Sequence, residues 1–190
     1  MSSLHADPLG PHSDVVSTAR LLLEFLVEGP QNVSAAVENG IARHLLSVDE
    51  NDVVHFAQKS RVKVYRINDS ASKVLSDTKT PQGVYAVCDI PDLMLADLQI
   101  TNFAIVLDRI SDPGNVGTII RTAAAFGADA VIALAGTADV WSGKVVRSTA
   151  GAFAEVKVLA GVTEEELSFW TKSQNCTFIN SFCYFIFCDI

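Results

Sequence analysis

The sequence predicts an α/β protein made of two successive units, and three observations carry this prediction. Strand-like and helix-like segments alternate twice along the chain, as expected where helices pack on a sheet. Two short and uninterrupted apolar runs, Phe103–Leu107 and Ala130–Leu134, have the composition of strands buried on both faces. The stretch Ile90-Pro91-Asp92 marks a change of unit between the two alternations. We therefore expect a linker over residues 91–101.

The elements expected in the first unit follow from hydrophobic spacing and turn residues. The apolar strand Leu23–Val27 ends at Glu28-Gly29-Pro30, and Pro30 suits the first turn of a helix. That helix carries its apolar residues at helical spacing and stops at Asn39-Gly40. The next elements are expected in this order: a strand over residues 41–48, a helix over 49–59, a strand around 62–67, a weak helix over 69–75 and a strand over 83–90.

A helix is expected after the Phe103–Leu107 strand. Pro113 and Gly114 favour a turn, and Asn115 is a suitable N-cap for the helix that follows. Arg121 lies on the side away from the apolar face, close to Thr118. An exposed arginine there could reach a cleft at the carboxyl edge of the sheet, where open α/β sheets place their ligands. The apolar face comprises Val116, Ile119, Ile120, Ala123, Ala124 and Gly127.

Composition restricts the class of protein. The 190 residues are 49% hydrophobic and 19% charged, which is ordinary for a globular protein. A net charge of −8 argues against a generic nucleic-acid binder but leaves room for a local basic patch. The apolar run Leu21–Val27 is too short to cross a membrane and contains Glu24, and no secretory signal is visible. A cytoplasmic protein is therefore expected, with residues 1–17 as a disordered tail.

The cysteines do not indicate a metal site. Cys176, Cys183 and Cys188 are spaced without a CxxC pair or a neighbouring histidine, and Cys88 stands apart. Reduced thiols and no bound metal are the favoured interpretation. Cys176 and Cys183 as metal ligands are the less favoured alternative.

Four segments of the chain carry a resemblance to a known family. The string DPGNVGTIIRTAAAFG, Asp112–Gly127, resembles the first signature motif of the SpoU/TrmH RNA ribose 2′-O-methyltransferases, within the SPOUT superfamily. Residues 144–152, KVVRSTAGA, resemble a second segment of the same family. Phe25–Gly29 and Thr80–Val84 are similar to parts of the substrate-recognition domain that precedes the catalytic domain in many members.

The resemblance implies a domain organisation and an activity. It implies a small N-terminal α/β RNA substrate-recognition domain over residues 18–90 and a SpoU-type methyltransferase domain, of the trefoil-knot type, over residues 102–190. It also implies methylation of a ribose 2′-hydroxyl with S-adenosylmethionine as the methyl donor. Ribosomal RNA is favoured over transfer RNA as the substrate, and a homodimer is the expected assembly.

The resemblance also assigns roles to residues. The motif arginine, here Arg121, would help to remove the hydroxyl proton, but a guanidinium stays protonated and would need a substrate phosphate to take that proton. Alternatively, Arg121 could clamp the phosphate through two hydrogen bonds. Asn115 would position the substrate or the arginine. Thr118, Arg147 and Ser148 are candidate RNA contacts, although the last two also fit an ordinary helix end.

The C-terminal segment departs from the family. The G-[ST]-E-x-x-G-[LI] loop and the N-[VL]-S-x-A segment, which hold the cofactor in the family, do not occur, so no cofactor-binding residue is assigned. After an acidic amphipathic helix over residues 163–172, residues 173–190 are expected to form a strand or to be a frameshift product, and the second is favoured. A methyltransferase domain lacking its C-terminal part and impaired in activity is expected. The alternatives are a non-catalytic RNA-binding remnant and an unrelated nucleotide-binding protein.

Overall fold

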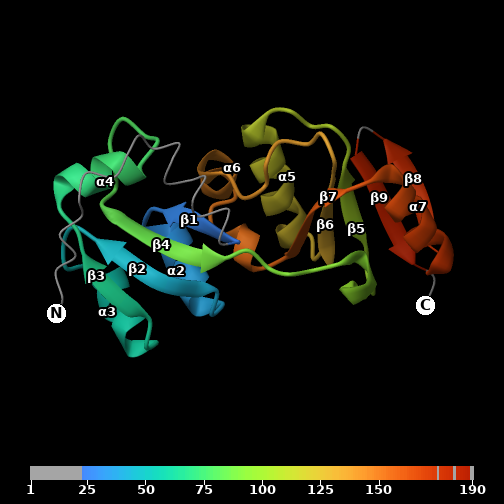
Figure 1. Cartoon of the computed structure of the whole chain (residues 1–190). Coiled ribbons are helices and arrows are strands. Elements are labelled where there is room, and N and C mark those ends of the chain that lie inside the picture. The colour runs from blue at the N-terminus through green and yellow to red at the C-terminus, as the bar shows by residue number, and fades with distance from the viewer. Residues whose placement is uncertain (1–22, 175, 182, 189–190) are drawn as a thin grey trace. The chain divides into compact units, whose positions relative to one another are not determined.

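The computed structural model describes residues 23–174, 176–181 and 183–188, and in the last two ranges it describes only the backbone. The chain divides into two compact units that meet at Ile90 and Pro91 (Figure 1). Each unit contains a sheet with helices packed on it, which confirms the α/β class. The tail expected over residues 1–17 lies outside the described residues.

Unit 1 is built on a four-stranded mixed sheet in the order β1-β4-β2-β3. Strand β4 lies between β1 and β2 and pairs antiparallel with both, whereas β2 and β3 are parallel. The strands are β1 (Glu24–Glu28), β2 (Ala42–Ser47), β3 (Lys63–Arg66) and β4 (Val84–Asp89), and the helices are α2 (Pro30–Glu38), α3 (Asp52–Lys59) and α4 (Asp69–Leu75).

Side-chain caps decide where two helices of unit 1 begin. The Asn51 side chain accepts a hydrogen bond from the Val54 amide at 3.0 Å, and the Asn68 side chain accepts one from the Ala71 amide at 2.8 Å. Such caps satisfy amide groups that the first helical turn leaves without partners. The sequence pattern predicted a helix start at residue 49. Because Asn51 is the cap, helix α3 begins at Asp52 instead.

Unit 2 is built on a five-stranded sheet in the order β7-β6-β5-β9-β8. The first three strands are parallel, and β9 pairs antiparallel with β5 and with β8. The segment expected to be either a strand or a frameshift product thus forms a β-hairpin that extends the sheet. The strands are β5 (Ala104–Leu107), β6 (Ala130–Leu134), β7 (Lys157–Val162), β8 (Cys176–Ser181) and β9 (Cys183–Cys188).

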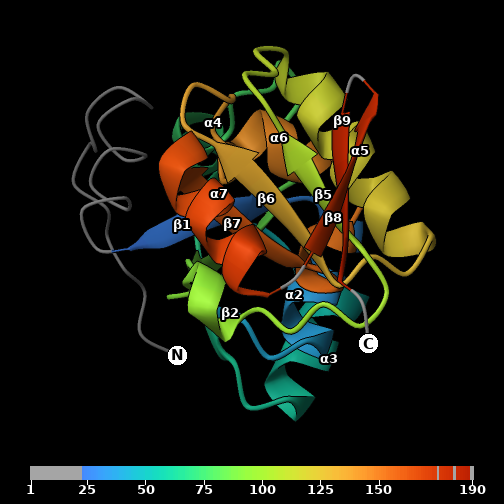
Figure 2. The ribbon, with the colours of Figure 1, turned by 90° about the vertical axis from the view of Figure 1, so that its right-hand side faces the viewer.

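Helices cover both faces of the unit 2 sheet. Helices α5 (Pro113–Ala125) and α6 (Gly143–Ser148) lie on one face, and α7 (Glu164–Ser173) lies on the other (Figure 1). Figure 2 shows this sheet from the side on which α7 lies. Alternate strand residues point toward α7, because successive side chains of a strand face opposite ways. The buried cluster on that side comprises Leu98, Ala104, Val106, Ala130, Ile132, Leu134, Leu159, Val162, Leu167 and Trp170.

The segment expected to be a linker instead belongs to unit 2. It forms a short 3-10 turn, η1 (Leu95–Asp97), and continues into Leu98, which is buried in the cluster beneath α7. Leu93, Leu95 and Ile100 pack against the same cluster. Residues 91–100 thus place four apolar side chains against the part of the sheet that α7 does not cover. Burial of this apolar area stabilises unit 2.

The described residues contain no grouping of His, Cys, Asp or Glu side chains that could hold a metal ion. Cys88 is a buried thiol, and burial raises its pKa above the ordinary value. The side chains of the other three cysteines lie outside the described residues. Within the same described part of the chain, no helix combines the length and the apolar character that a membrane crossing requires.

Candidate functional site

The helix that carries the first motif begins at Asp112. The Asp112 carboxylate accepts a hydrogen bond from the Asn115 amide at 2.8 Å, and Pro113 occupies the first helical position. The expectation that Asn115 caps this helix is therefore wrong, because Asn115 lies inside the first turn. An aspartate directly before a proline is a regular helix start, since proline lacks the amide hydrogen that a cap would have to satisfy.

The loop between β5 and α5 is held in place by the loop that follows β6. The Thr137 hydroxyl donates to the Leu107 carbonyl at 3.0 Å, and the Ala138 amide donates to the Ile110 carbonyl at 2.9 Å. Arg109 adopts a left-handed backbone, with φ of 52°, and its side chain pairs with the neighbouring Asp108. These contacts fix the position from which α5 starts.

Arg109 also connects this loop to α7. Its guanidinium lies 3.1 Å from a carboxylate oxygen of Glu164, in the first turn of α7. Both side chains are well exposed, so this ion pair adds little stability. Sequence reasoning missed Arg109, and the spacing gave no signal for it, because Glu164 is distant in sequence and becomes a neighbour only through the sheet.

The outward face of α5 presents the predicted site residues. Asn115, Thr118 and Arg121 are all exposed, which confirms the expected orientation of Arg121. The Thr118 hydroxyl donates to the Gly114 carbonyl at 2.8 Å, which leaves its oxygen available as an acceptor. Asn115 and Arg121 are separated by six residues, or about 9 Å along the helix axis. They can therefore contact neighbouring parts of an extended ligand rather than a single atom.

The second motif meets the first through Gly117. A Cβ atom at this position would lie 2.6 Å from the Val145 carbonyl oxygen and would also collide with the Ser148 side chain. Only glycine allows α5 and α6 to approach this closely, because it has no side chain. The contact places Ser148 against Gly117, which directly precedes Thr118 in the sequence.

Ser148 and Arg147 end helix α6 half-buried. The Ser148 hydroxyl donates to the Lys144 carbonyl at 2.9 Å, and Arg147 carries its positive charge in the last turn, where the helix dipole favours it. The chain then turns sharply through Ala150 and Gly151, both with positive φ. The positions of Arg147 and Ser148 are therefore explained in part by the end of helix α6. Their contact with RNA remains a prediction.

Replacing Asp112 with alanine should destabilise unit 2 by about 1 kcal/mol, because the cap of α5 is lost. Replacing Asn115 with alanine should leave stability nearly unchanged, since only its backbone amide takes part in the cap. Chemical denaturation of the two variants, followed by circular dichroism, compares them directly. Equal losses of stability would contradict the assignment of Asp112 as the cap.

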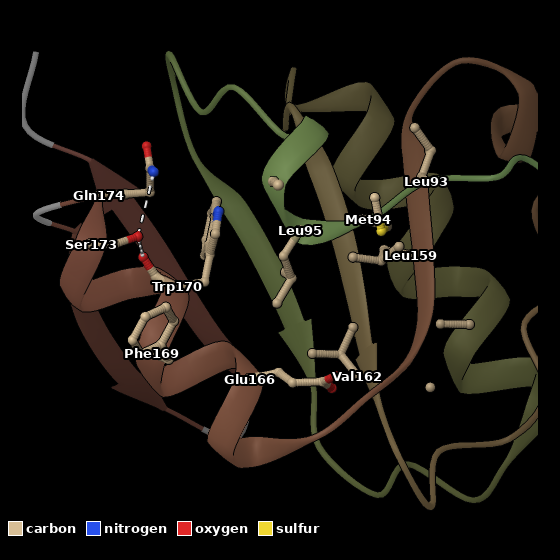
Figure 3. Close-up of a pocket in the computed structure, with 13 residues that line it drawn as sticks. Leu93, Met94, Leu95, Leu159, Val162, Glu166, Phe169, Trp170, Ser173 and Gln174 are labelled. Atoms are coloured by element: carbon tan, nitrogen blue, oxygen red, sulfur yellow. Dashed lines mark hydrogen bonds between the residues drawn. The ribbon is translucent and has the colours of Figure 1, made fainter.

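A cavity of about 560 Å³ lies on the opposite face of the unit 2 sheet (Figure 3). It is bordered by the segment around η1, by the end of β7 and by α7. None of the five predicted site residues lines it. Its wall is mainly apolar, and it includes the partly buried Leu93 and Leu95 and the exposed Phe169.

The polar groups of this cavity are few, and most of them already form hydrogen bonds within α7. The Glu166 carboxylate already accepts hydrogen bonds from the Thr163 amide and hydroxyl, at 2.8 and 2.9 Å, and these bonds lower its pKa. The Ser173 hydroxyl donates to the Trp170 carbonyl at 2.7 Å. Both bonds to Glu166 end on Oε2, and Glu166 carries the one carboxylate among the residues that line this cavity. No residue of this cavity is assigned to the cofactor.

Comparison with known families agrees with this arrangement. Residues 102–181 match the SpoU rRNA Methylase family, and residues 23–86 match the MRM3-like substrate binding domain. These ranges fall within unit 2 and unit 1, respectively. Unit 2 is therefore a SpoU-type methylase domain.

Curated relatives carry consistent names. The chain is 36% identical over 136 residues to the 23S rRNA (guanosine(2553)-2′-O)-methyltransferase RlmP of Bacillus subtilis, an alignment covering 71% of this chain and 53% of the relative. It is 29% identical to rRNA methyltransferase 3A, mitochondrial, of Danio rerio, covering 76% of this chain and 35% of the relative. The chain thus spans about half, or less, of the length of these relatives.

Solved structures share the fold. The SpoU methyltransferase AviRb from Streptomyces viridochromogenes, in complex with the cofactor AdoMet, superimposes with a TM-score of 0.75 and 27% identity. That match covers 84% of this chain and 63% of the other. An AdoMet-bound rRNA methyltransferase from Sinorhizobium meliloti gives a TM-score of 0.70 and 27% identity, covering 83% and 61%.

Proposed function

We propose that this protein methylates a ribose 2′-hydroxyl of ribosomal RNA, with S-adenosylmethionine as the methyl donor. The observation that carries the proposal is the SpoU-type domain with Arg121 and Asn115 exposed on one helix. The names of the Bacillus subtilis and Danio rerio relatives support ribosomal RNA as the substrate. The AdoMet complexes of two structural neighbours support the choice of methyl donor.

Arg121 acts on the RNA side of the reaction in this proposal. A guanidinium presents its donors in a planar fork that matches a phosphate. It has no ion-pair or hydrogen-bond partner among the described residues, so it is available to bind one. Holding the phosphate fixes the adjacent ribose, and the phosphate can accept the hydroxyl proton that the guanidinium cannot.

Asn115, Thr118 and Ser148 complete the proposed RNA-binding surface. Asn115 lies at the start of α5, one helical turn before Thr118, and Ser148 packs against Gly117 of the same helix. Uncharged donors and acceptors of this kind bind sugar and phosphate oxygens and fix the position of a strand. Arg147 at the end of α6 would supply a second positive charge.

Transfer of a tritiated methyl group from S-adenosylmethionine to protein-free ribosomal RNA tests the proposal. We expect incorporation that maps to one ribose by primer extension at low nucleotide concentration. RNA binding without incorporation would instead support a non-catalytic RNA-binding protein. Absence of both would contradict the proposal and its alternative together.

A homodimer in the cytoplasm is part of the same proposal. The family resemblance supports the dimer, and Phe126 at the end of α5, whose side chain is 74% exposed, is a candidate contact residue. Light scattering coupled to size-exclusion chromatography should give twice the 20.4 kDa mass of the chain. A monomeric mass at micromolar concentration would remove the dimer from the proposal.

A further inference from the structure

The cavity bordered by η1, β7 and α7 has walls of the kind that bind small organic molecules. Its volume of about 560 Å³ lies within the usual range of ligand sites in proteins. Leu95, Phe169 and Trp170 supply apolar and aromatic surface, and Figure 3 shows them projecting from η1 and α7. Phe169 is 77% exposed and Trp170 only 6%, so this wall runs from the surface of unit 2 toward its core.

A bulge in β7 keeps one side of the cavity free of side chains. Ala160 pairs with Ala133 and Val162 pairs with Leu134, so Gly161 is the extra residue of β7. Gly161 has φ of 75°, a left-handed conformation that favours glycine. Apart from its chain neighbours, no atom of the described residues lies within 4 Å of the position that a Cβ would take there. The backbone of the bulge therefore borders open space.

The indole of Trp170 adds a polar group without a partner to this mainly apolar wall. Its Nε1 is buried and has no hydrogen-bond acceptor among the described residues. Buried donors are almost always paired in folded proteins, and an unpaired one costs free energy. An oxygen acceptor on a molecule bound in the cavity would satisfy this donor.

Glu166 gives the cavity a negative charge. Among the residues that line the cavity, all of them described, Glu166 alone is charged. Its Oε2 accepts both hydrogen bonds from Thr163, whereas Oε1 has no partner among the described residues. The bonds from Thr163 hold the pKa of Glu166 below its ordinary value, so the carboxylate is ionised at neutral pH. Oε1 is thus available to a cationic group.

We propose that this cavity binds a small apolar molecule that carries a protonated amine. The amine pairs with Oε1 of Glu166, and the apolar body lies against Leu95, Phe169 and Trp170. An oxygen of the same molecule accepts a hydrogen bond from Trp170 Nε1. The inference does not depend on methyl transfer, because none of the five predicted site residues lines the cavity.

Three probes that share a naphthalene ring and an ether oxygen test the proposal, namely naphthyloxyethylamine, naphthyloxyethanol and naphthyloxyacetate. Each is titrated into the full chain, and backbone amides are followed by two-dimensional NMR. We expect shifts confined to residues 93–96, 159–162 and 166–174, with a dissociation constant of about 1 mM or lower for the amine. The alcohol should bind about fivefold more weakly, because an exposed ion pair contributes little more than that, and the acetate more weakly still.

Two of the possible results with the wild-type chain would overturn the proposal. One is the absence of shifts around the cavity, and the other is binding of the alcohol or the acetate as tightly as the amine. Displacement of the amine by an equal concentration of S-adenosylmethionine would overturn it as well, because the cavity would then be the cofactor site.

Glu166→Gln tests the charge separately from the shape of the cavity. Glutamine serves as well as glutamate in this capping position, so α7 should remain folded. The variant should bind the amine no better than the alcohol, and its affinity for the alcohol should stay unchanged, which also verifies the fold. A preference for the amine that survives in Glu166→Gln would contradict the role of Glu166.

The matched control is Glu165→Gln, which removes the neighbouring exposed charge of α7 that does not line the cavity. It should bind all three probes like the wild type, and loss of the amine preference in this variant would refute pairing with Glu166. Phe169→Ala removes an exposed ring from the wall and should weaken all three probes alike, by about threefold or more. Unchanged binding in Phe169→Ala would place the probes elsewhere and overturn the inference.

Discussion

Arg121→Ala should lower methyl transfer to ribosomal RNA by at least about a hundredfold while leaving the fold intact. The loss is expected because positioning and proton transfer by one group commonly contribute that much to a rate. The fold is expected to survive because Arg121 is exposed and takes part in no hydrogen bond or ion pair with the described residues. Initial rates at saturating RNA, with circular dichroism spectra of both proteins, provide the measurement.

Two further variants sharpen this result. Arg121→Lys keeps the charge but loses the planar fork, so it should retain only part of the activity if the two-bond phosphate clamp matters. Thr122→Ala alters the next exposed position of α5 and should behave like the wild type. Full turnover in Arg121→Ala would remove Arg121 from its role, whereas loss in Thr122→Ala would indicate a disturbed helix.

Gly117→Ala should destabilise unit 2 by about 2 kcal/mol, which is the opposite of the usual effect. In an ordinary helix interior, alanine is more favourable than glycine by about 1 kcal/mol. Here the added methyl group would meet the Val145 carbonyl oxygen of α6, and a backbone atom cannot rotate away. Overpacking of this kind costs about 1–3 kcal/mol, so the two helices should separate.

Thermal and urea denaturation measure the effect of Gly117→Ala. The midpoint should fall by about 8 °C or more, given about 4–8 °C per kcal/mol for a unit of this size. Thr122→Ala, on the same helix and exposed, should be neutral or slightly stabilising. A Gly117→Ala protein as stable as the wild type would mean that α5 and α6 are not in contact at this point.

Local patterns predicted the elements of unit 1 and, in unit 2, the strands β5 and β6 with the helix between them and the helix α7. The β5 and β6 strands follow from uninterrupted apolar runs, and the outward position of Arg121 follows from helical spacing. The start of α5 was predictable too, because Asp112 before Pro113 is a recognised helix start, and the error came from weighing Asn115 more heavily.

Features set by distant contacts were beyond the sequence. Gly117 looked like one turn residue among several, and its need for glycine appears only when α6 lies against it. The pairing of β9 with β5 joins segments about 80 residues apart, and no local pattern encodes that partner. The ion pair of Arg109 with Glu164 has the same character. In each case the residue type is visible in the sequence, but the residue it contacts is known only from the folded structure.

The packing of Leu98 beneath α7 has a consequence for how this domain could be moved between proteins. The first motif lies well after Leu98, and a boundary drawn at residue 102 would leave a hole in the cluster that contains Trp170. A fusion that starts at Pro91 should fold, whereas one that starts at residue 102 should aggregate when expressed. The segment over residues 91–101 carries no predicted catalytic residue, yet the domain needs it to fold. Recombination that kept only the motifs would therefore not transfer a folded domain.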